Sequence, residues 1–406
     1  MKTAIRVWSM LCLLTAPAAG AAQTLPFEDV VGNLTNPDPE LRIAAVRLLR
    51  DAQYPEAVVP MAQLVNDPVL EVQLEAIAAE LSFFLIEEIP EEGRVALVFE
   101  GRSRAERAYE MGFTATWPKR PPVELVAALV KAIDDDEAPV RLEALYTLGV
   151  IGAGVIDADA ARRLSAALEH YDPAVRAVAA RVAGRLEVQA ATEGLIKALH
   201  DASVDVRRAA MRALGDIKAE SAVTPLAEQL TYHGAGPGAV AALDALARIG
   251  HPSSIPLFEA RLADPDPWMR RAAAEGMGRA GAHSASERLR DAAIMDESRM
   301  VRVAMAFGLN ALGEARAVRM IDLVESVETM RQVQGYLFEL GPPVVPQLLP
   351  RLHEAFVPTR RAVIETLGVL GNASVEPALA RFLDDKDADV AKAATIATTM
   401  IRMRAQ

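Results

Sequence analysis

Histidines are the side chains of this chain best suited to binding a metal, and they are few. His170, His200 and His233 fall at the end of the first helix predicted in three successive segments. Imidazole is a good metal ligand, but helices stacked about 10 Å apart would hold these rings too far apart to share one ion. We therefore interpret them as residues at helix C-termini and predict no metal site.

Acidic runs offer a second kind of site, a calcium loop. Asp385, Asp387 and Asp389 alternate as at the start of such a loop, but the glycine expected at the sixth position is missing and Ile396 stands where the closing glutamate belongs. The acidic run 134–137 is interpreted in the same way. Both segments are predicted to be loops that precede helices.

Glycine-rich and nucleophile motifs do not point to an enzyme either. The segment 149–154 is rich in glycine but follows a predicted helix, whereas a dinucleotide-binding loop follows a strand. The chain contains no His-Glu-x-x-His, no phosphate-binding loop and no Gly-x-Ser-x-Gly. We predict no catalytic residues and no cofactor.

Composition favours close-packed helices and disfavours nucleic acid as a partner. Of 406 residues, 51% are hydrophobic but only 5% are aromatic, so small and aliphatic side chains dominate. The formal net charge is −12. Phosphate binding requires clustered lysine and arginine, so an acidic chain is a poor candidate for it.

Residues 1–22 are predicted to be a secretory signal peptide. Lys2 and Arg6 precede a short apolar run at 7–14, and small residues follow at 16–22. The only cysteine, Cys12, lies in this leader. No later stretch has the roughly 20 apolar residues of a membrane helix. We expect bacterial export to the periplasm, with residues 23–406 forming one domain.

A recurrent arginine organises that domain. Its neighbouring copies cluster about 31 residues apart. Clear copies are Arg42, Arg141, Arg176, Arg207, Arg270, Arg302 and Arg360, and degenerate copies have Gln73, Ala242 and Ala391. A period of this length without strand signals predicts a stack of two-helix units. We expect an all-α, right-handed superhelix of about 11–12 such repeats.

Each repeat carries signals for its second helix. A capping residue stands four positions before the arginine, as at Asp172 and Ser203. A glycine follows the last apolar residue, as at Gly278, and we expect it to end the helix in left-handed backbone. The arginine lies in the first turn, where the helix dipole disfavours a cation. We therefore predict that it pairs with loop carboxylates, giving a ladder of Asp–Arg contacts along one edge.

The pattern Val-Arg-x-x-Ala-x-x-x-Leu-Gly with an Asp-Pro cap resembles HEAT-like repeats of the phycobilisome-lyase-like kind, over most of residues 27–402. The resemblance implies a helical solenoid, and such proteins are mostly scaffolds, adaptors and transport factors, with a few enzymes. A HEAT-like hydroxylase holds di-iron with several His-Glu pairs, whereas this chain has only His353-Glu354. The bilin lyases act on phycobiliproteins, for which an exported chain is poorly placed.

Residues 82–122 depart from the repeat and are rich in aromatic side chains. They form either a degenerate repeat whose rings fill a gap in the stack or an insertion with an exposed apolar patch for a partner. The candidate patch is Phe99, Tyr109, Phe113 and Trp117. A second departure, 320–340, keeps helical spacing but loses the arginine.

Second helices are expected to line the concave face of the solenoid, and the residue five positions after the arginine is expected to face solvent there. These candidate partner-binding residues are Arg47, Tyr146, Arg181, Arg212, Glu275, Phe307 and Glu365. We expect this face to be basic in its first half and more acidic or apolar in its second.

The leading hypothesis is a non-enzymatic, monomeric scaffold or adaptor of the bacterial envelope that binds another protein on this face. One alternative is an accessory subunit or enzyme of the lyase or hydroxylase type with a metal or cofactor. The other is a protein that binds the envelope surface through the aromatic insertion.

Overall fold

The computed structural model describes residues 26–86, 103–111, 116–117, 119–324, 326–353 and 356–405. The predicted signal peptide at 1–22 lies outside these ranges, as do Phe99 and Phe113 of the candidate patch.

Helices dominate the described residues, and all but one of them form pairs. The first helices are α1 (Phe27–Gly32), α3 (Val58–Ala62), α6 (Val123–Ala132), α8 (Ala158–Ala167), α10 (Thr192–Ala198), α12 (Val223–His233), α14 (Ile255–Arg261), α16 (Ser286–Met295), α18 (Ala317–Asp322), α20 (Val345–Leu348) and α22 (Glu376–Leu379). The second helices are α2 (Pro39–Asp51), α4 (Leu70–Ser82), α7 (Ala138–Ile151), α9 (Pro173–Arg185), α11 (Val204–Asp216), α13 (Gly236–Ile249), α15 (Pro267–Arg279), α17 (Arg299–Ala311), α19 (Val327–Leu340), α21 (Val357–Leu370) and α23 (Ala388–Ala405). The unpaired helix is α5 (Arg104–Met111).

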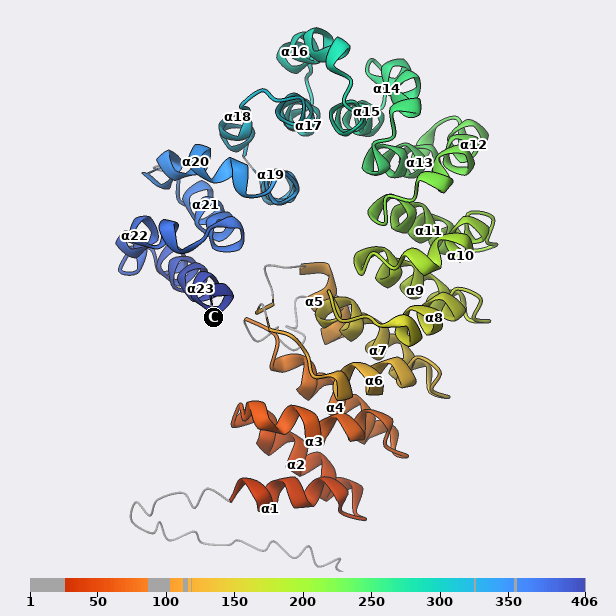
Figure 1. Cartoon of the computed structure of the whole chain (residues 1–406), viewed down its shortest axis with the longest axis vertical. Coiled ribbons are helices and arrows are strands. Elements are labelled where there is room, and N and C mark those ends of the chain that lie inside the picture. Colours follow the sequence, from red (N-terminus) through yellow and green to blue (C-terminus); the bar gives the residue numbers. More distant parts are fainter. Residues whose placement is uncertain are drawn as a thin grey trace, which may run out of the picture.

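The pairs stack into an all-α solenoid with two layers (Figure 1). The first helices form the outer, convex layer and the second helices form the inner, concave layer. The stack rises from α1 to α13 and then bends round through α15, α17 and α19. The predicted fold class and the concave position of the second helices are therefore confirmed, while the handedness of the superhelix stays a prediction.

The inner helices begin where the sequence places their caps. The carboxylates of Asp38, Asp172 and Asp266 each accept a hydrogen bond from a backbone N–H of the first turn, and a proline follows each of them. Ser203 and Ser298 occupy the same position but make no such side-chain bond. An aspartate two residues earlier, Asp201 or Asp296, accepts the N–H of the serine instead.

Four of the seven recurrent arginines form the predicted ladder. The Arg176 guanidinium makes two hydrogen bonds of 2.8 Å to the carboxylate of Asp201 in the next repeat. Its remaining N–H groups donate to the carbonyls of His170 and Tyr171 in its own loop. Equivalent pairs join successive repeats elsewhere: Arg42–Asp67, Arg270–Asp296 and Arg360–Asp385. The loop carbonyls and the neighbouring carboxylate together offset the unfavourable helix dipole.

Most of the repeat glycines have a different role from the one predicted. Gly250 does adopt left-handed backbone, with φ of 66°. Gly184, Gly278 and Gly368 instead lie within helices at points where the next inner helix comes close. A Cβ on Gly278 would lie 2.6 Å from the Cα of Gly308. These glycines therefore permit close helix packing and do not end the helix.

The segment after α4 leaves the stack, and the stack continues without it. Gln73 of α4 donates a 2.8 Å hydrogen bond to Asp135, in the loop before α7, and Asn66 donates to the carbonyl of Ala128 in α6. The second repeat thus packs directly on the pair α6–α7. The backbone N–H of Trp117 donates to the carbonyl of Phe84, so the two described ends of the insertion meet at its base.

Between these ends, α5 packs on α7 at the concave side (Figure 1). Among the described residues, no helix is both long and apolar enough to cross a membrane.

Candidate protein-binding face

The concave-face residues chosen from the sequence differ widely in exposure. Arg47 is exposed, as is Arg212, whose side chain is 70% exposed. Arg181 and Glu365 are partly exposed. The other three are buried: Tyr146 and Glu275 are each 6% exposed, and Phe307 is 1% exposed. The prediction that this position faces solvent is wrong for these three residues.

Helix α5 covers Tyr146. The Tyr146 hydroxyl donates a 3.2 Å hydrogen bond to the Glu106 carboxylate and accepts one of 3.1 Å from Arg181. Tyr109 of α5 packs against the Tyr146 ring, and its hydroxyl donates to the carbonyl of Arg181. Burial raises the pKa of Tyr146 to about 12.

The same contacts correct the candidate patch of the insertion. Tyr109 is buried under the guanidinium of Arg185, whose central carbon lies 3.6 Å from the ring centroid. Trp117 is only partly exposed. The described rings of the insertion therefore pack inward, as expected of rings that fill a gap, and Tyr109 is not part of an exposed patch.

Helix α19 covers Glu275 and Phe307. Tyr336 of α19 donates a 2.5 Å hydrogen bond to the Glu275 carboxylate, and its ring stacks on Phe307 with 4.3 Å between centroids. Arg279 of α15 joins the two helices, since it binds Glu275 at 2.9 Å and Glu339 through two hydrogen bonds of 2.6 and 2.8 Å. We call these five residues the α15–α19 cluster.

Charge pairing keeps the carboxyl group of Glu275 ionised. Burial alone raises its pKa, but the guanidinium groups of Arg279 and Arg271 outweigh burial and lower it. The pKa of Tyr336 is raised by burial and by the nearby charge of Glu275, so the phenol remains a donor. The cluster is therefore a hydrogen-bonded network, buried except at Glu339, that joins α15 to α19 across an intervening repeat.

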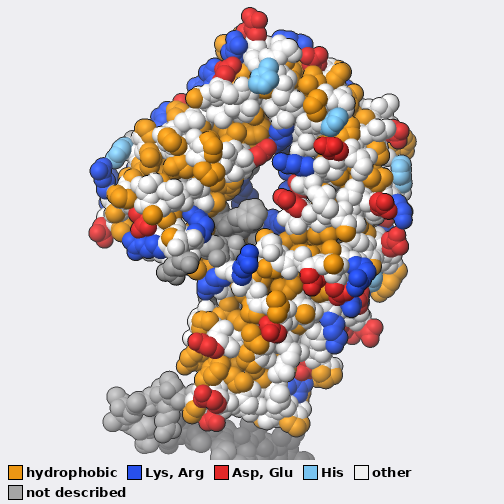
Figure 2. All heavy atoms as spheres, viewed as in Figure 1, with side chains coloured by type: hydrophobic (Ala, Val, Ile, Leu, Met, Phe, Trp, Pro, Cys, Tyr) orange, Lys and Arg blue, Asp and Glu red, His pale blue; other side chains and the backbone are white. Residues whose placement is uncertain are grey.

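A cleft of about 710 Å³ opens on the concave face between α5, α7, α9 and α11. Its apolar floor is made by Leu142, Ala177, Val178 and Ala209. Arg181, Arg208 and Arg212 line one side. Glu106 and Glu110 line the side formed by α5, and Asp205 stands on α11. Figure 2 shows cationic and anionic side chains together around the opening within the curved stack.

One arginine at this cleft, Arg208, and one beside it, Arg185, were missed by reasoning from the repeat. Arg208 directly follows the reference Arg207, and Arg185 comes nine residues after the reference Arg176. Arg208 and Arg212 are one helical turn apart on α11 and both are exposed. That spacing was a signal in the sequence, but a search restricted to one position per repeat could not find it.

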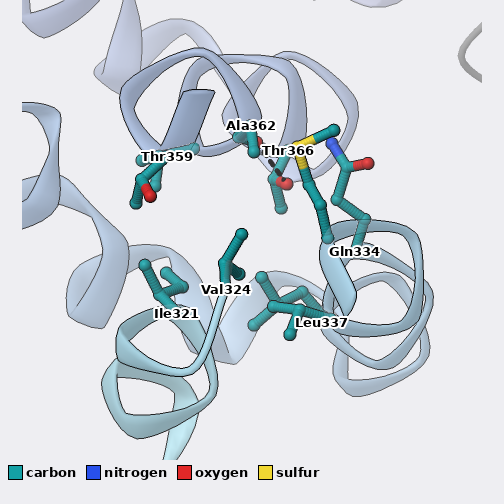
Figure 3. Close-up of a pocket in the computed structure, with 10 residues that line it drawn as sticks. Ile321, Val324, Gln334, Leu337, Thr359, Ala362 and Thr366 are labelled. Atoms are coloured by element: carbon teal, nitrogen blue, oxygen red, sulfur yellow. Dashed lines mark hydrogen bonds between the residues drawn. The ribbon is translucent and has the colours of Figure 1, made fainter. Parts of the chain in front are cut away.

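A second cavity, of about 10 Å³, lies between α18, α19 and α21. Figure 3 shows Ile321, Val324 and Leu337 pointing into it from one side and Thr359, Ala362 and Thr366 from the other. Its volume is far below the roughly 300 Å³ of a small ligand pocket. It is a packing gap beside helix α19.

The histidines take part in local contacts. His170 accepts the backbone N–H of Asp172 through Nδ1 at 3.0 Å, and the His233 ring packs edge-on against Tyr232. Within the part of the chain that the structure describes, no three histidine, cysteine, aspartate or glutamate side chains gather closely enough to hold a metal ion.

A family comparison agrees with this architecture over part of the chain. The family model described as HEAT repeats matches residues 160–235 and 225–310. A search of curated protein sequences gave no match. Among solved structures, the chain is similar to the complex of CpcE and CpcF of phycocyanin lyase from Nostoc sp. PCC7120. The identity is 19% and the TM-score 0.34, over 79% of this chain and 93% of the other.

The matched residues 160–310 contain α9, α11, α13 and α15, which have Arg176, Arg207, Ala242 and Arg270 at the reference position. The same paired-helix unit, with the same ladder contacts, continues on both sides of this range. The chain is a HEAT-like repeat protein.

Proposed function

We propose that this protein is a non-enzymatic scaffold or adaptor of the bacterial envelope and that it binds a protein partner on its concave face. The observation that supports the proposal best is the cleft between α5, α7, α9 and α11. It combines charged sides with an apolar floor, which is the mixture found at protein interfaces. Curved helical stacks provide extended concave surfaces that bind other proteins.

A photo-crosslinking experiment tests the face that binds. Benzoylphenylalanine replaces Ala174, an exposed residue at the cleft, and in a separate protein it replaces Tyr232, an exposed residue on the outer helix α12. Both proteins are produced in the native host and irradiated in cells. We expect a protein adduct from position 174 and none from position 232. Adducts from the outer position alone would contradict binding on the concave face.

Export is tested separately, because it rests on residues 1–22. Cell fractionation of a C-terminally tagged protein should place it in the periplasm, and deletion of residues 1–22 should retain it in the cytoplasm. Equal distribution of the two proteins would exclude an envelope function. A stoichiometric transition metal in the purified, exported protein would contradict the non-enzymatic part of the proposal.

A further inference from the structure

Three arginines line one side of the concave cleft, and a fourth, Arg185, lies beside them against Tyr109. Arg181 and Arg185 come from α9, and Arg208 and Arg212 come from the next inner helix, α11. Both arginines of α9 lie over the ring of Tyr109, which brings their guanidinium groups together. We call these four residues the arginine side of the cleft.

The charges of the arginine side are unevenly compensated. Arg181 binds the Tyr146 hydroxyl and lies 3.7 Å from the Glu110 carboxylate. The Arg212 guanidinium lies 3.8 Å from the Asp216 carboxylate, which is too far for a hydrogen bond. That carboxylate is already bound by Arg248 at 2.8 Å. Arg185 and Arg208 form no ion pair with any carboxylate of the described residues. The arginine side therefore retains cationic groups that have no strong anionic partner.

The absence of a carboxylate partner affects the pKa of Arg185. Its guanidinium is half-buried on the Tyr109 ring. Burial lowers its pKa, and the positive charges of Arg212 and Arg181 lower it further, although Tyr109 and Asp216 act in the opposite direction. A partly desolvated cation among like charges is stabilised by an incoming anion. Arg185 itself does not line the cleft, so a ligand carboxylate between α9 and α11 would stabilise it through space and not by a direct pair.

The floor and the opposite side of the cleft indicate which kind of ligand would bear this carboxylate. The floor of Leu142, Ala177, Val178 and Ala209 is apolar, so a ligand that covers it needs apolar side chains as well. On the opposite side, Glu106 already accepts from Tyr146 and Glu110 lies beside Arg181. These two carboxylates disfavour a ligand that is acidic on both edges. A polypeptide segment with carboxylates along one edge meets all three requirements.

We propose that the cleft binds an extended acidic segment of the partner protein. The carboxylates of this segment pair with Arg208 and Arg212, and its apolar side chains lie on Ala177 and Val178. Asp205, on α11, lowers the affinity for very dense negative charge and so favours a segment in which acidic and apolar residues alternate. The proposal rests on the proposed function and adds the chemistry of the partner.

Fluorescence polarisation tests this chemistry with defined peptides. The probe is a fluorescein-labelled dodecapeptide of alternating glutamate and leucine, whose glutamates lie along one edge when it is extended. The comparison peptides carry lysine or glutamine in place of glutamate. We expect only the glutamate peptide to bind the full-length protein, with an affinity that falls as salt is raised. The double variant Arg208→Glu with Arg212→Glu should bind at least about tenfold more weakly.

A matched variant separates local from general charge effects. Arg162→Glu with Arg288→Glu makes the same change in net charge at exposed arginines of the outer helices α8 and α16 and should leave affinity unchanged. Equal binding of the lysine or glutamine peptide, or an unchanged affinity of the Arg208/Arg212 variant, overturns the proposal. In that case the crosslinking experiment decides what fails. If benzoylphenylalanine at position 174 still forms a protein adduct, only the acidic character of the partner is wrong. If it forms none, the proposed function is wrong as well.

Discussion

Glu80 is the residue that departs most from the repeat. It lies seven residues after the reference position Gln73, where other repeats place Leu214, Leu309 or Leu367. Its side chain is 0% exposed, and neither carboxylate oxygen has a hydrogen-bond partner in the described structure. Burial raises its pKa well above the ordinary value. The Glu80 carboxyl group is therefore protonated within the core, and its unsatisfied oxygens lower the stability of the fold.

The substitution Glu80→Gln should stabilise the protein, and the gain should grow with pH. The unfolded carboxyl loses its proton near its ordinary pKa, whereas the folded one holds it to higher pH. The wild type therefore loses stability as pH rises between these two values, and the glutamine variant does not. We expect a gain of about 1–3 kcal/mol at the upper end of this window. Urea unfolding at pH 5 and pH 8 measures it.

Glu71→Gln provides the control, since Glu71 is exposed on the same helix. Its effect should be small at both pH values. A Glu80→Gln variant whose gain is the same at pH 5 and pH 8 would show that the carboxyl titrates alike in the folded and unfolded states.

Residue roles could be predicted where the repeat itself determines them. The arginine ladder follows from a cation recurring at an unfavourable helix position, because a partner has to compensate it. The burial of Tyr146 and Glu275 could not be predicted in this way. The helices that cover them, α5 and α19, arise from the two segments where the repeat pattern fails.

At the scale of elements, the α15–α19 cluster replaces an ordinary contact between neighbours. Among the described residues, Arg302 of α17 binds only carbonyls of its own loop and makes no ladder contact to the next repeat. In its place, Tyr336 and Glu339 of α19 reach past α17 to Glu275 and Arg279 of α15. This contact lies where the stack bends, and we expect it to hold the curvature there.

Tyr336→Phe combined with Glu339→Gln should loosen this bend. The change leaves the buried Glu275 with one partner fewer and removes the charge that holds Arg279, at a cost of about 1–3 kcal/mol for the lost hydrogen bond. Small-angle X-ray scattering should give a larger radius of gyration than for the wild type.

The control for this loosening is Arg402→Gln, which breaks an exposed pair with Glu376 in the last repeat. It should leave the scattering profile unchanged. A folded double variant with wild-type dimensions would mean that the cluster does not set the curvature.

Gly278→Ala should destabilise the solenoid although alanine is the better helix former. Its Cβ would lie 2.6 Å from the Cα of Gly308, so α15 and α17 would have to separate. We expect a loss of about 1–3 kcal/mol from this overpacking. Gly335→Ala is the matched control, because nothing lies within 4 Å of its Cβ position, also within a helix. It should stabilise by about 0.5–1 kcal/mol. Thermal unfolding of both variants distinguishes packing from propensity.

The paired helices could be predicted because many copies of one pattern agree, even though single copies are degenerate. Glycine at the end of an apolar run was ambiguous, since left-handed backbone and close helix approach both select it. The next inner helix comes close to both Gly250 and Gly278, and only the positive φ of Gly250 distinguishes them. Neither property can be read from the local sequence.

For the whole molecule, the ladder and the shape change at the same place. From α2 to α11, successive repeats are joined by side chains at the reference position. Where the usual Asp–Arg pair is absent, Gln73 binds Asp135 and Arg141 binds the Tyr171 hydroxyl. Arg207, at the end of this run, has only carbonyl partners among the described residues, and Ala242 follows it. This half is the straighter part of the stack, and the bend begins beyond it (Figure 1).

The interrupted ladder makes the molecule mechanically uneven. Each Asp–Arg contact is a crosslink at one edge that resists the tilting of one repeat on the next, as at Arg42–Asp67 and Arg176–Asp201. Where the contact is missing, pairs between the inner helices take its place: Arg248 of α13 binds Asp216 of α11, and Arg271 of α15 binds Asp244 of α13. The crosslinks between repeats therefore shift from the loop edge to the concave side at the place where the stack bends, and tilting there has its pivot on the inner helices.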